Sequence, residues 1–385
     1  MQKIFLIIAL VGTLTGALFS TKTLAVINKN MAAAKEAARP ANVKIVKITT
    51  PNCQDCFNVD GAVLDFKKLN VKVAEEKSYV FDSPEAKAKI SQLGIKKLPT
   101  YLVTGEVIKQ TIADFVKTNG EIKDNTFIFT KLSPVFIDTT TGQEMGRVTA
   151  TLITDSSCSQ CPDLKLVIDN FQKAGVKIKD LKELSFNSLD GRRLINQYKI
   201  TKIPTFIFSP EFDLYDAIKA AWANFGTVEE DKTYNSSGAR ISSSAYVARN
   251  IPLPYRDLAK GKIAGLVDLV YLTDSSCADC YKVQDVQRPI LTQGYGVALR
   301  SEQTVDAASA EGKKLISRYT ITKIPTILLS PEADQYSNIK DIWQSVGTVA
   351  ADGWYVFTGL SQLGNITYKD LIENQVIKPA EQTKK

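Results

Sequence analysis

The 385-residue sequence contains no histidine. That absence excludes mechanisms that need an imidazole as base, proton shuttle or metal ligand, including serine–histidine hydrolysis and Cys₂His₂ zinc sites. Charge of one sign is not concentrated either: the net charge is +7, but lysines and acidic residues alternate along most of the chain. We therefore expect a solvated surface, and no nucleic-acid partner is predicted.

Long apolar runs are confined to the N-terminus. Residues 4–19 are almost continuously apolar, and the small residues Thr23 and Ala25 supply a cleavage site. Residues 1–27 are predicted to be a signal peptide or, because the run approaches the about 20 residues that cross a bilayer, an uncleaved membrane anchor. We expect an exported, extracytoplasmic protein that is secreted, periplasmic or membrane-tethered; a cytosolic protein is the alternative.

Cysteine is scarce, and its placement is regular. All six cysteines lie in three Cys-x-x-Cys pairs, and each pair is followed at nearly the same distance by isoleucine or leucine, then proline and threonine. The pairs are Cys53/Cys56, Cys158/Cys161 and Cys277/Cys280, and the dipeptides are Leu98-Pro99, Ile203-Pro204 and Ile324-Pro325. Three copies predict three tandem domains, which agrees with the about 100–150 residues of a typical domain.

The repeat also sets the expected domain boundaries. In each domain an apolar strand leads into the dithiol, and apolar residues at helical spacing follow it. In the first domain, Ser83 and Pro84 predict a helix start and Gly94 its end. Two segments that share an aromatic residue and an aspartate, 136–138 and 255–257, precede the second and third dithiols, and we assign them to the starts of those domains. The predicted organisation is a signal or anchor, a linker and three domains: 1–27, 28–42, 43–132, 133–250 and 251–378.

A dithiol at the first turn of a helix is a reversible redox device. Asn52, Ser157 and Ser276 are N-cap residue types, so we expect the first cysteine of each pair at the first helical position, where the helix dipole and unpaired amides stabilise a thiolate. The second cysteine, one turn on, is placed to resolve a mixed disulfide. Asp55 and Asp279, between the cysteines, are expected to oppose thiolate formation.

Three residues around the second and third pairs add detail. Asp155 and Asp274 lie just before the first cysteine, and we favour a turn or capping role for them over a role as proton acceptors. Pro162 follows Cys161 immediately and predicts that the helix there kinks or begins later, because proline is poorly tolerated inside a helix.

The recurrent proline is the second half of the motif. Isoleucine or leucine before Pro-Thr and an apolar strand predicts a cis peptide bond. Such a bond would leave the backbone of Leu98, Ile203 or Ile324 exposed beside the thiols, free to pair with an extended substrate strand. The alternative is an ordinary edge-strand proline, which would not account for three recurrences.

Each unit resembles a thioredoxin-fold domain, on the strength of the Cys-x-x-Cys pair after a strand and the later proline. The resemblance implies an α/β fold of three tandem thioredoxin-like domains, each a central mixed β-sheet flanked by helices. It also implies that the first cysteine of each pair is the nucleophile, that the second resolves, and that a cis-proline faces them. The chain departs from the family in having no tryptophan before the first cysteine.

The expected function is that of an extracytoplasmic thiol-disulfide oxidoreductase. Its partners would be exported proteins with thiols or disulfides, an unidentified redox partner and, through an anchor, a membrane. No cofactor and no metal site are predicted. Two alternatives stay open: a redox-inactive binding scaffold with structural disulfides, and a protein that captures Cu(I) or Zn(II) through paired thiolates. Zinc needs four ligands, so it would require pairs from different domains.

Overall fold

The structure is a computed structural model that describes residues 26–231 and 243–379. The predicted signal or anchor therefore lies, except for its last two residues, outside the described residues. Residues 26–38 form an exposed helix. Within the described ranges, no helix is both long enough and apolar enough to cross a membrane.

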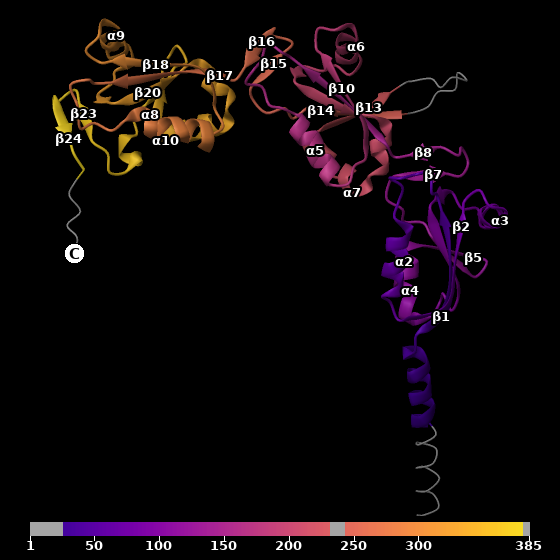
Figure 1. Cartoon of the computed structure of the whole chain (residues 1–385). Coiled ribbons are helices and arrows are strands. Elements are labelled where there is room, and N and C mark those ends of the chain that lie inside the picture. Colours follow the sequence, from indigo (N-terminus) through magenta and orange to yellow (C-terminus); the bar gives the residue numbers. More distant parts are fainter. Residues whose placement is uncertain (1–25, 232–242, 380–385) are drawn as a thin grey trace, which may run out of the picture. The chain divides into compact units, whose positions relative to one another are not determined.

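Three five-stranded sheets organise the chain, and each has helices packed on it (Figure 1). One sheet lies in a compact unit of Met1–Val148 with Glu211–Asp216, and the other two lie in a unit of Thr149–Pro210 with Ala217–Lys385. In all three sheets the strand that leads into the dithiol pairs with the strand that follows the proline, which lies in the middle of the sheet and runs antiparallel to it. The expected fold class, three tandem thioredoxin-like domains with mixed sheets flanked by helices, is confirmed.

The first sheet has the order β2-β1-β4-β6-β5. Its strands are β1 (Ala41–Thr49), β2 (Val71–Val80), β4 (Thr100–Gly105), β5 (Gly120–Lys123) and β6 (Thr126–Phe129). Helices α2 (Val59–Lys67) and α4 (Gln110–Asn119) cover one face, and α3 (Pro84–Leu93) covers the other (Figure 1). Ser83 caps α3 through the amide of Ala86, and Gly94 ends it with a φ of 65°, as predicted.

The second and third sheets repeat this order. The second contains, in sheet order, β10 (Ile178–Ser185), β9 (Val148–Thr154), β12 (Thr205–Phe208), β14 (Ser243–Ala248) and β13 (Gly226–Asp231), with helices α5 (Lys165–Lys173) and α6 (Leu189–Gln197). The third contains β18 (Ala298–Asp306), β17 (Leu266–Thr273), β20 (Thr326–Leu329), β22 (Tyr355–Phe357) and β21 (Gly347–Val349), with α8 (Val283–Pro289), α9 (Ala310–Tyr319) and α10 (Ser337–Val346).

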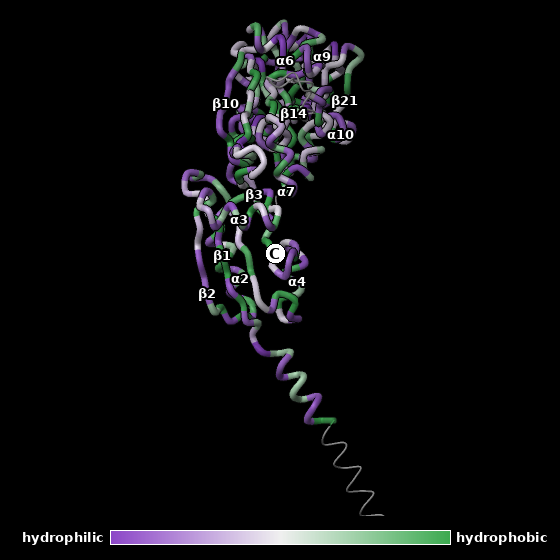
Figure 2. Tube along the Cα trace, turned by 90° about the vertical axis from the view of Figure 1, so that its right-hand side faces the viewer, coloured by the Kyte–Doolittle hydropathy of each residue, from purple (hydrophilic) through white to green (hydrophobic). Residues whose placement is uncertain are grey.

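In the first domain, alternation along the strands fills two cores, one on each face of the sheet. In β4, Tyr101 and Val103 pack with α2 and α4, whereas Leu102 between them packs with α3 on the opposite face. Successive side chains of a strand point to opposite faces, so one apolar strand serves both cores. The outer strand β2 has exposed residues and is coloured largely hydrophilic along its trace in Figure 2.

A two-stranded hairpin follows each five-stranded sheet and pairs with the short strand just before the proline. In chain order, the short strand and the hairpin are β3 (Lys97–Leu98) with β7 (Phe136–Asp138) and β8 (Glu144–Met145), β11 (Lys202–Ile203) with β15 (Tyr255–Asp257) and β16 (Lys262–Ala264), and β19 (Lys323–Ile324) with β23 (Tyr368–Asp370) and β24 (Gln375–Ile377). The segments 136–138 and 255–257, which the sequence assigned to the starts of domains, are thus paired with the preceding domain, beyond the boundaries at 133 and 251. A third copy, 368–370, closes the last domain.

Candidate functional site

All six cysteines form disulfides within their own Cys-x-x-Cys pairs. The Cα atoms of the paired cysteines lie 5.3 to 5.4 Å apart. The bonds Leu98-Pro99, Ile203-Pro204 and Ile324-Pro325 are cis, as the sequence predicts. In the first domain both cysteines and Pro99 line one cavity of about 400 Å³, and in the second both cysteines and Pro204 line one of about 240 Å³.

The helix after each dithiol begins later than predicted. Helices α2, α5 and α8 start at Val59, Lys165 and Val283, and each pair lies in a separate turn, closed in the first domain by the Cys56 amide donating to the Cys53 carbonyl at 3.3 Å. The expectation that the first cysteine occupies the first helical position is therefore wrong, and the helix dipole does not supply the thiolate stabilisation we inferred from it.

The hairpins explain part of this delay. In the first domain the residue after the pair, Phe57, donates its amide to the carbonyl of Val135 at 2.8 Å, and in the third Tyr281 donates to Thr367 at 2.9 Å. Both acceptors are the residues just before a hairpin, and an amide directed to them cannot take part in a helix that runs on from the dithiol. At the same position the second domain has Pro162, which has no amide hydrogen, and α5 begins after it, as predicted.

The first cysteine of each pair is the more buried one. Cys53, Cys158 and Cys277 are only 7–9% exposed, whereas their partners are of intermediate exposure. A nucleophile must be reached by the sulfur that it attacks. The assignment of the first cysteines as nucleophiles and the second as resolvers stays a prediction, and in the structure the second cysteine is the more accessible of the two.

The backbone before each cis-proline is already paired. Leu98, Ile203 and Ile324 are 0–1% exposed, and they pair in antiparallel register with three residues of the hairpins, respectively Ile137, Arg256 and Lys369. The expectation that this edge is free is wrong for this conformation. The role of Leu98, Ile203 and Ile324 in substrate binding stays a prediction, because a substrate strand would need the same backbone groups.

In the second domain the hairpin places a cation beside the dithiol turn. The Arg256 guanidinium forms an ion pair with the Asp155 carboxylate and donates to the Ser157 hydroxyl at 2.8 Å. Asp155 also accepts from the Ser157 amide at 2.9 Å, so its predicted turn role is confirmed. Burial raises the pKa of Asp155, but the hydrogen bonds from Ser157 and Arg256 outweigh it and leave the pKa below its usual value.

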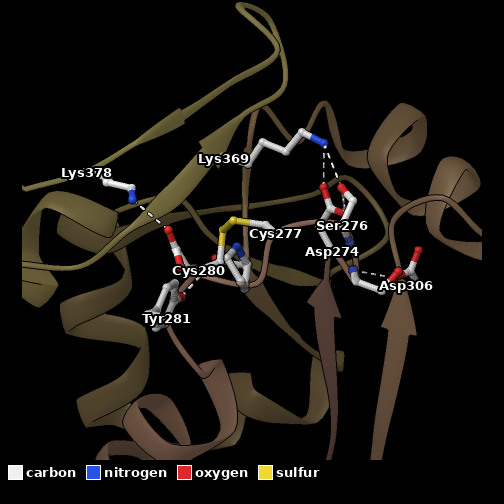
Figure 3. The surroundings of a disulfide bond; sticks show 11 residues. Asp274, Ser276, Cys277, Cys280, Tyr281, Asp306, Lys369 and Lys378 are labelled. Atoms are coloured by element: carbon white, nitrogen blue, oxygen red, sulfur yellow. Dashed lines mark hydrogen bonds and ion pairs between the residues drawn. A yellow bond between two sulfur atoms is a disulfide. The ribbon is translucent and has the colours of Figure 1, made fainter.

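The third domain repeats the arrangement with lysine, as Figure 3 shows. The Lys369 ammonium lies 2.7 Å from the Asp274 carboxylate, and Asp274 accepts from the amide of Ser276 at 2.8 Å. Here too burial raises the pKa of the aspartate, and the hydrogen bonds from Lys369 and Ser276 lower it further than burial raises it. The first domain has Thr50 and Ile137 at these two places, so its hairpin lacks this ion pair.

The aspartates between the cysteines also have cationic partners. Arg147, just after the first hairpin, pairs with Asp55, and Lys378, just after the third, lies 2.7 Å from Asp279. The Lys378 hydrogen bond lowers the pKa of Asp279. Each cation offsets the negative charge that we expected to oppose a thiolate at the neighbouring cysteine.

Sequence reasoning missed the hairpin cations and the role of the threonine after each proline. The hydroxyls of Thr100, Thr205 and Thr326 are buried and donate to a backbone carbonyl of the next strand in the sheet, at 2.5 to 2.7 Å. They join the proline turn to β6, β14 and β22. The recurrence of threonine after all three prolines was the signal in the sequence that could have revealed this role. The hairpin cations gave only a weak signal, because the position of Arg256 and Lys369 is occupied by Ile137 in the first domain.

Comparisons with known proteins add little. No family model matches the chain, and no curated protein matches it. Among solved structures it is similar to the alkylhydroperoxide reductase AhpF of Enterococcus faecalis (14% identity, 46% of this chain and 86% of that chain, TM-score 0.16). It is also similar to human ERp44 form II (13% identity, 85% and 81%, TM-score 0.15) and to a protein disulfide oxidoreductase of Aeropyrum pernix (16% identity, 51% and 85%, TM-score 0.13). TM-scores this low carry no argument, so the fold assignment depends on the sheet order, the dithiol turns and the cis-prolines.

Proposed function

We propose that the chain is a thiol-disulfide oxidoreductase that acts outside the cytoplasm on thiols or disulfides of exported proteins. The observation that carries the proposal is the threefold pairing of a Cys-x-x-Cys disulfide with a cis-proline just before the middle strand of the sheet. In two domains both cysteines and the proline line one cavity. The extracytoplasmic location rests on the apolar N-terminal run in the sequence.

The exchange needs no group beyond the two cysteines and a substrate disulfide. A thiolate of the reduced pair attacks one substrate sulfur, a mixed disulfide forms, and the other substrate sulfur leaves as a thiolate. The second cysteine thiolate then attacks the first cysteine's sulfur, the protein disulfide forms, and the remaining substrate sulfur leaves. Two electrons pass to the substrate, whose thiolates take up the two protons that the dithiol released. An external dithiol donor returns the electrons, and the reverse sequence forms a substrate disulfide.

The experiment is a redox titration of each pair by alkylation across a glutathione series, together with an insulin reduction assay. The proposal expects reversible titration between about −120 and −270 mV, the range of known catalysts. It also expects turnover to fall when Cys53, Cys158 and Cys277 are replaced by serine. Potentials below about −300 mV with no turnover would contradict it.

A second candidate is a binding scaffold whose disulfides are structural. The observation that favours it is the burial of Cys53, Cys158 and Cys277, together with the hairpins that occupy the neighbouring strand edges. The same titration decides between the two, because a scaffold needs no reversible potential. Capture of a soft metal has less support: the described part of the chain contains no group of three or more acidic or cysteine side chains that could hold an ion.

A further inference from the structure

We propose that the hairpin after each sheet is an intramolecular strap that occupies the strand-docking edge beside the dithiol, and that an extended polypeptide carrying a disulfide displaces it in order to react. The inference rests on the proposed function and deepens it, because it assigns the substrate class and the gate of the same site. The straps are residues 136–145, 255–264 and 368–377.

The strap pairs with the strand edge that ends at the cis-proline. In the second domain Ile203, which precedes the cis-proline, pairs with Arg256, and Lys202 pairs with Asp257. The Leu258 amide extends the ladder by donating to the Thr201 carbonyl at 2.9 Å. A polypeptide that docks by strand addition uses main-chain hydrogen bonds to the same edge. Strap and substrate therefore compete for one set of backbone groups.

An ion pair also joins the strap to the dithiol turn. The side chain of Asp155 is 2% exposed and that of Arg256 is 18% exposed, so the pair is shielded from solvent and is not a weak surface contact. One strap residue thus pairs with the edge through its backbone and holds the dithiol turn through its side chain. Lys369 does both in the third domain. In the second domain Pro162 has no amide hydrogen with which to bond to the segment before the strap. Among the described residues, the Arg256 side chain is therefore the main link between the strap and the dithiol turn, and we call this ion pair, and its Lys369 counterpart, the latch.

A cavity beside the dithiol gives a second route to the sulfur atoms. The cavity that contains Cys158, Cys161 and Pro204 is lined by residues of the dithiol turn, the start of α5 and the strands β9 and β10, and by none of the strap. The cavity of the first domain likewise is lined by none of its strap. A small disulfide can enter this cavity while the strap stays in place. The strap therefore discriminates against extended substrates and leaves small ones unaffected.

The test uses the full chain with Cys53, Cys56, Cys277 and Cys280 replaced by serine, so that one dithiol remains. The rate at which the reduced pair is oxidised is measured with oxidised glutathione and with an extended peptide dimer joined by one disulfide. Arg256→Glu places like charges together at the latch. It is expected to raise the peptide rate by about tenfold or more and the glutathione rate by less than about twofold.

Two variants serve as controls. Arg192→Glu makes the same charge change on the exposed face of α6 and is expected to alter neither rate. Asp155→Thr with Arg256→Ile introduces the pair that the first domain has at these places, Thr50 and Ile137, and is expected to keep the strap closed. Its peptide rate should stay within about threefold of the parent, since well-packed apolar groups replace an ion pair at little cost.

Hydrogen exchange separates strap opening from unfolding. In Arg256→Glu, the Leu258 amide is expected to lose protection while amides of β12 keep theirs. If that variant unfolds, the parent protein decides: adding the peptide with serine in place of cysteine should speed exchange at Leu258, and no change there would overturn the strap. Equal changes in the peptide and glutathione rates, or none, would also overturn it while the proposed function stands. A pair that reacts with neither disulfide in any variant would remove the proposed function itself.

Discussion

Arg256 pairs in register with Ile203, the residue before cis-Pro204, and its side chain reaches the Asp155 carboxylate beside the dithiol. A single residue therefore couples the strand edge, the proline turn and the dithiol turn. Lys369 repeats this relationship with Ile324. The latch consequently has a titratable partner in two domains and none in the first.

The latch of the third domain is expected to open in acid. Asp274 faces Lys369, Ser276 and the Asp306 carboxylate, and its pKa lies below the usual value. A carboxyl group with a depressed folded-state pKa contributes stability above its unfolded value of about 3.9, and this contribution is lost as pH falls through the folded-state pKa. The protection factor of the Leu371 amide, which donates to the Thr322 carbonyl, should therefore hold down to about pH 4 and fall below it.

Asp274→Thr with Lys369→Ile provides the matched control for this acid transition. It removes the titrating carboxylate and leaves the strap backbone unchanged, so protection at Leu371 should no longer fall at low pH. An identical fall in this variant would show that another group controls the strap, and Asp306 would be the first to examine.

The threonine after the cis-proline is expected to stabilise each domain through one buried hydrogen bond. Thr326→Val keeps the shape of the side chain but leaves the Phe357 carbonyl without its 2.6 Å donor. The expected loss is about 1–3 kcal/mol in the free energy of unfolding, the cost of an unpaired buried polar group. Chemical denaturation measures it. The exposed Thr348→Val should change stability by no more than about 0.5 kcal/mol, and equal effects would refute the assignment.

The fold followed from the sequence because its signals are local and repeated. The dithiol, the proline and the cap at Ser83 each lie within a few residues of the feature that they determine. The hairpins did not follow, because strands of two or three residues carry no periodicity and their pairing partners lie far along the chain. Segment 136–138 matches 255–257, and both precede a dithiol, which favours a domain start; the third copy, at 368–370, follows the last dithiol and is the signal that assigns all three to domain ends.

The two cysteines of one pair are expected to differ in reactivity while the strap is closed. With Cys277→Ser, only Cys280 remains in the third domain, and with Cys280→Ser only Cys277, which is 9% exposed. Iodoacetamide should alkylate Cys280 faster than Cys277 in the folded protein, because access limits the reaction of a buried thiol. In denaturant the two rates should converge. Faster alkylation of Cys277 in the folded state would show that its thiolate character outweighs its burial.

Tyr281 is expected to hold the dithiol turn of the third domain against the cis-proline. Its hydroxyl donates to the Pro325 carbonyl at 3.0 Å, and its amide donates to the carbonyl of Thr367, the residue just before the strap. Burial raises the pKa of Tyr281 to about 12. The neutral hydroxyl therefore stabilises the fold fully below the ordinary tyrosine value of about 10, and this contribution is lost only as pH rises through the folded-state value.

Tyr281→Phe removes the hydroxyl and keeps both the ring and the amide. The free energy of unfolding should fall by about 1 kcal/mol. Because the same residue also holds Thr367, which leads into the strap, exchange at the Leu371 amide should also accelerate. Tyr295→Phe, at a half-buried tyrosine of the same domain, serves as the control and should leave Leu371 unchanged. Lower stability without faster exchange at Leu371 would mean that the Tyr281 hydroxyl supports the proline turn alone and does not couple the dithiol turn to the strap.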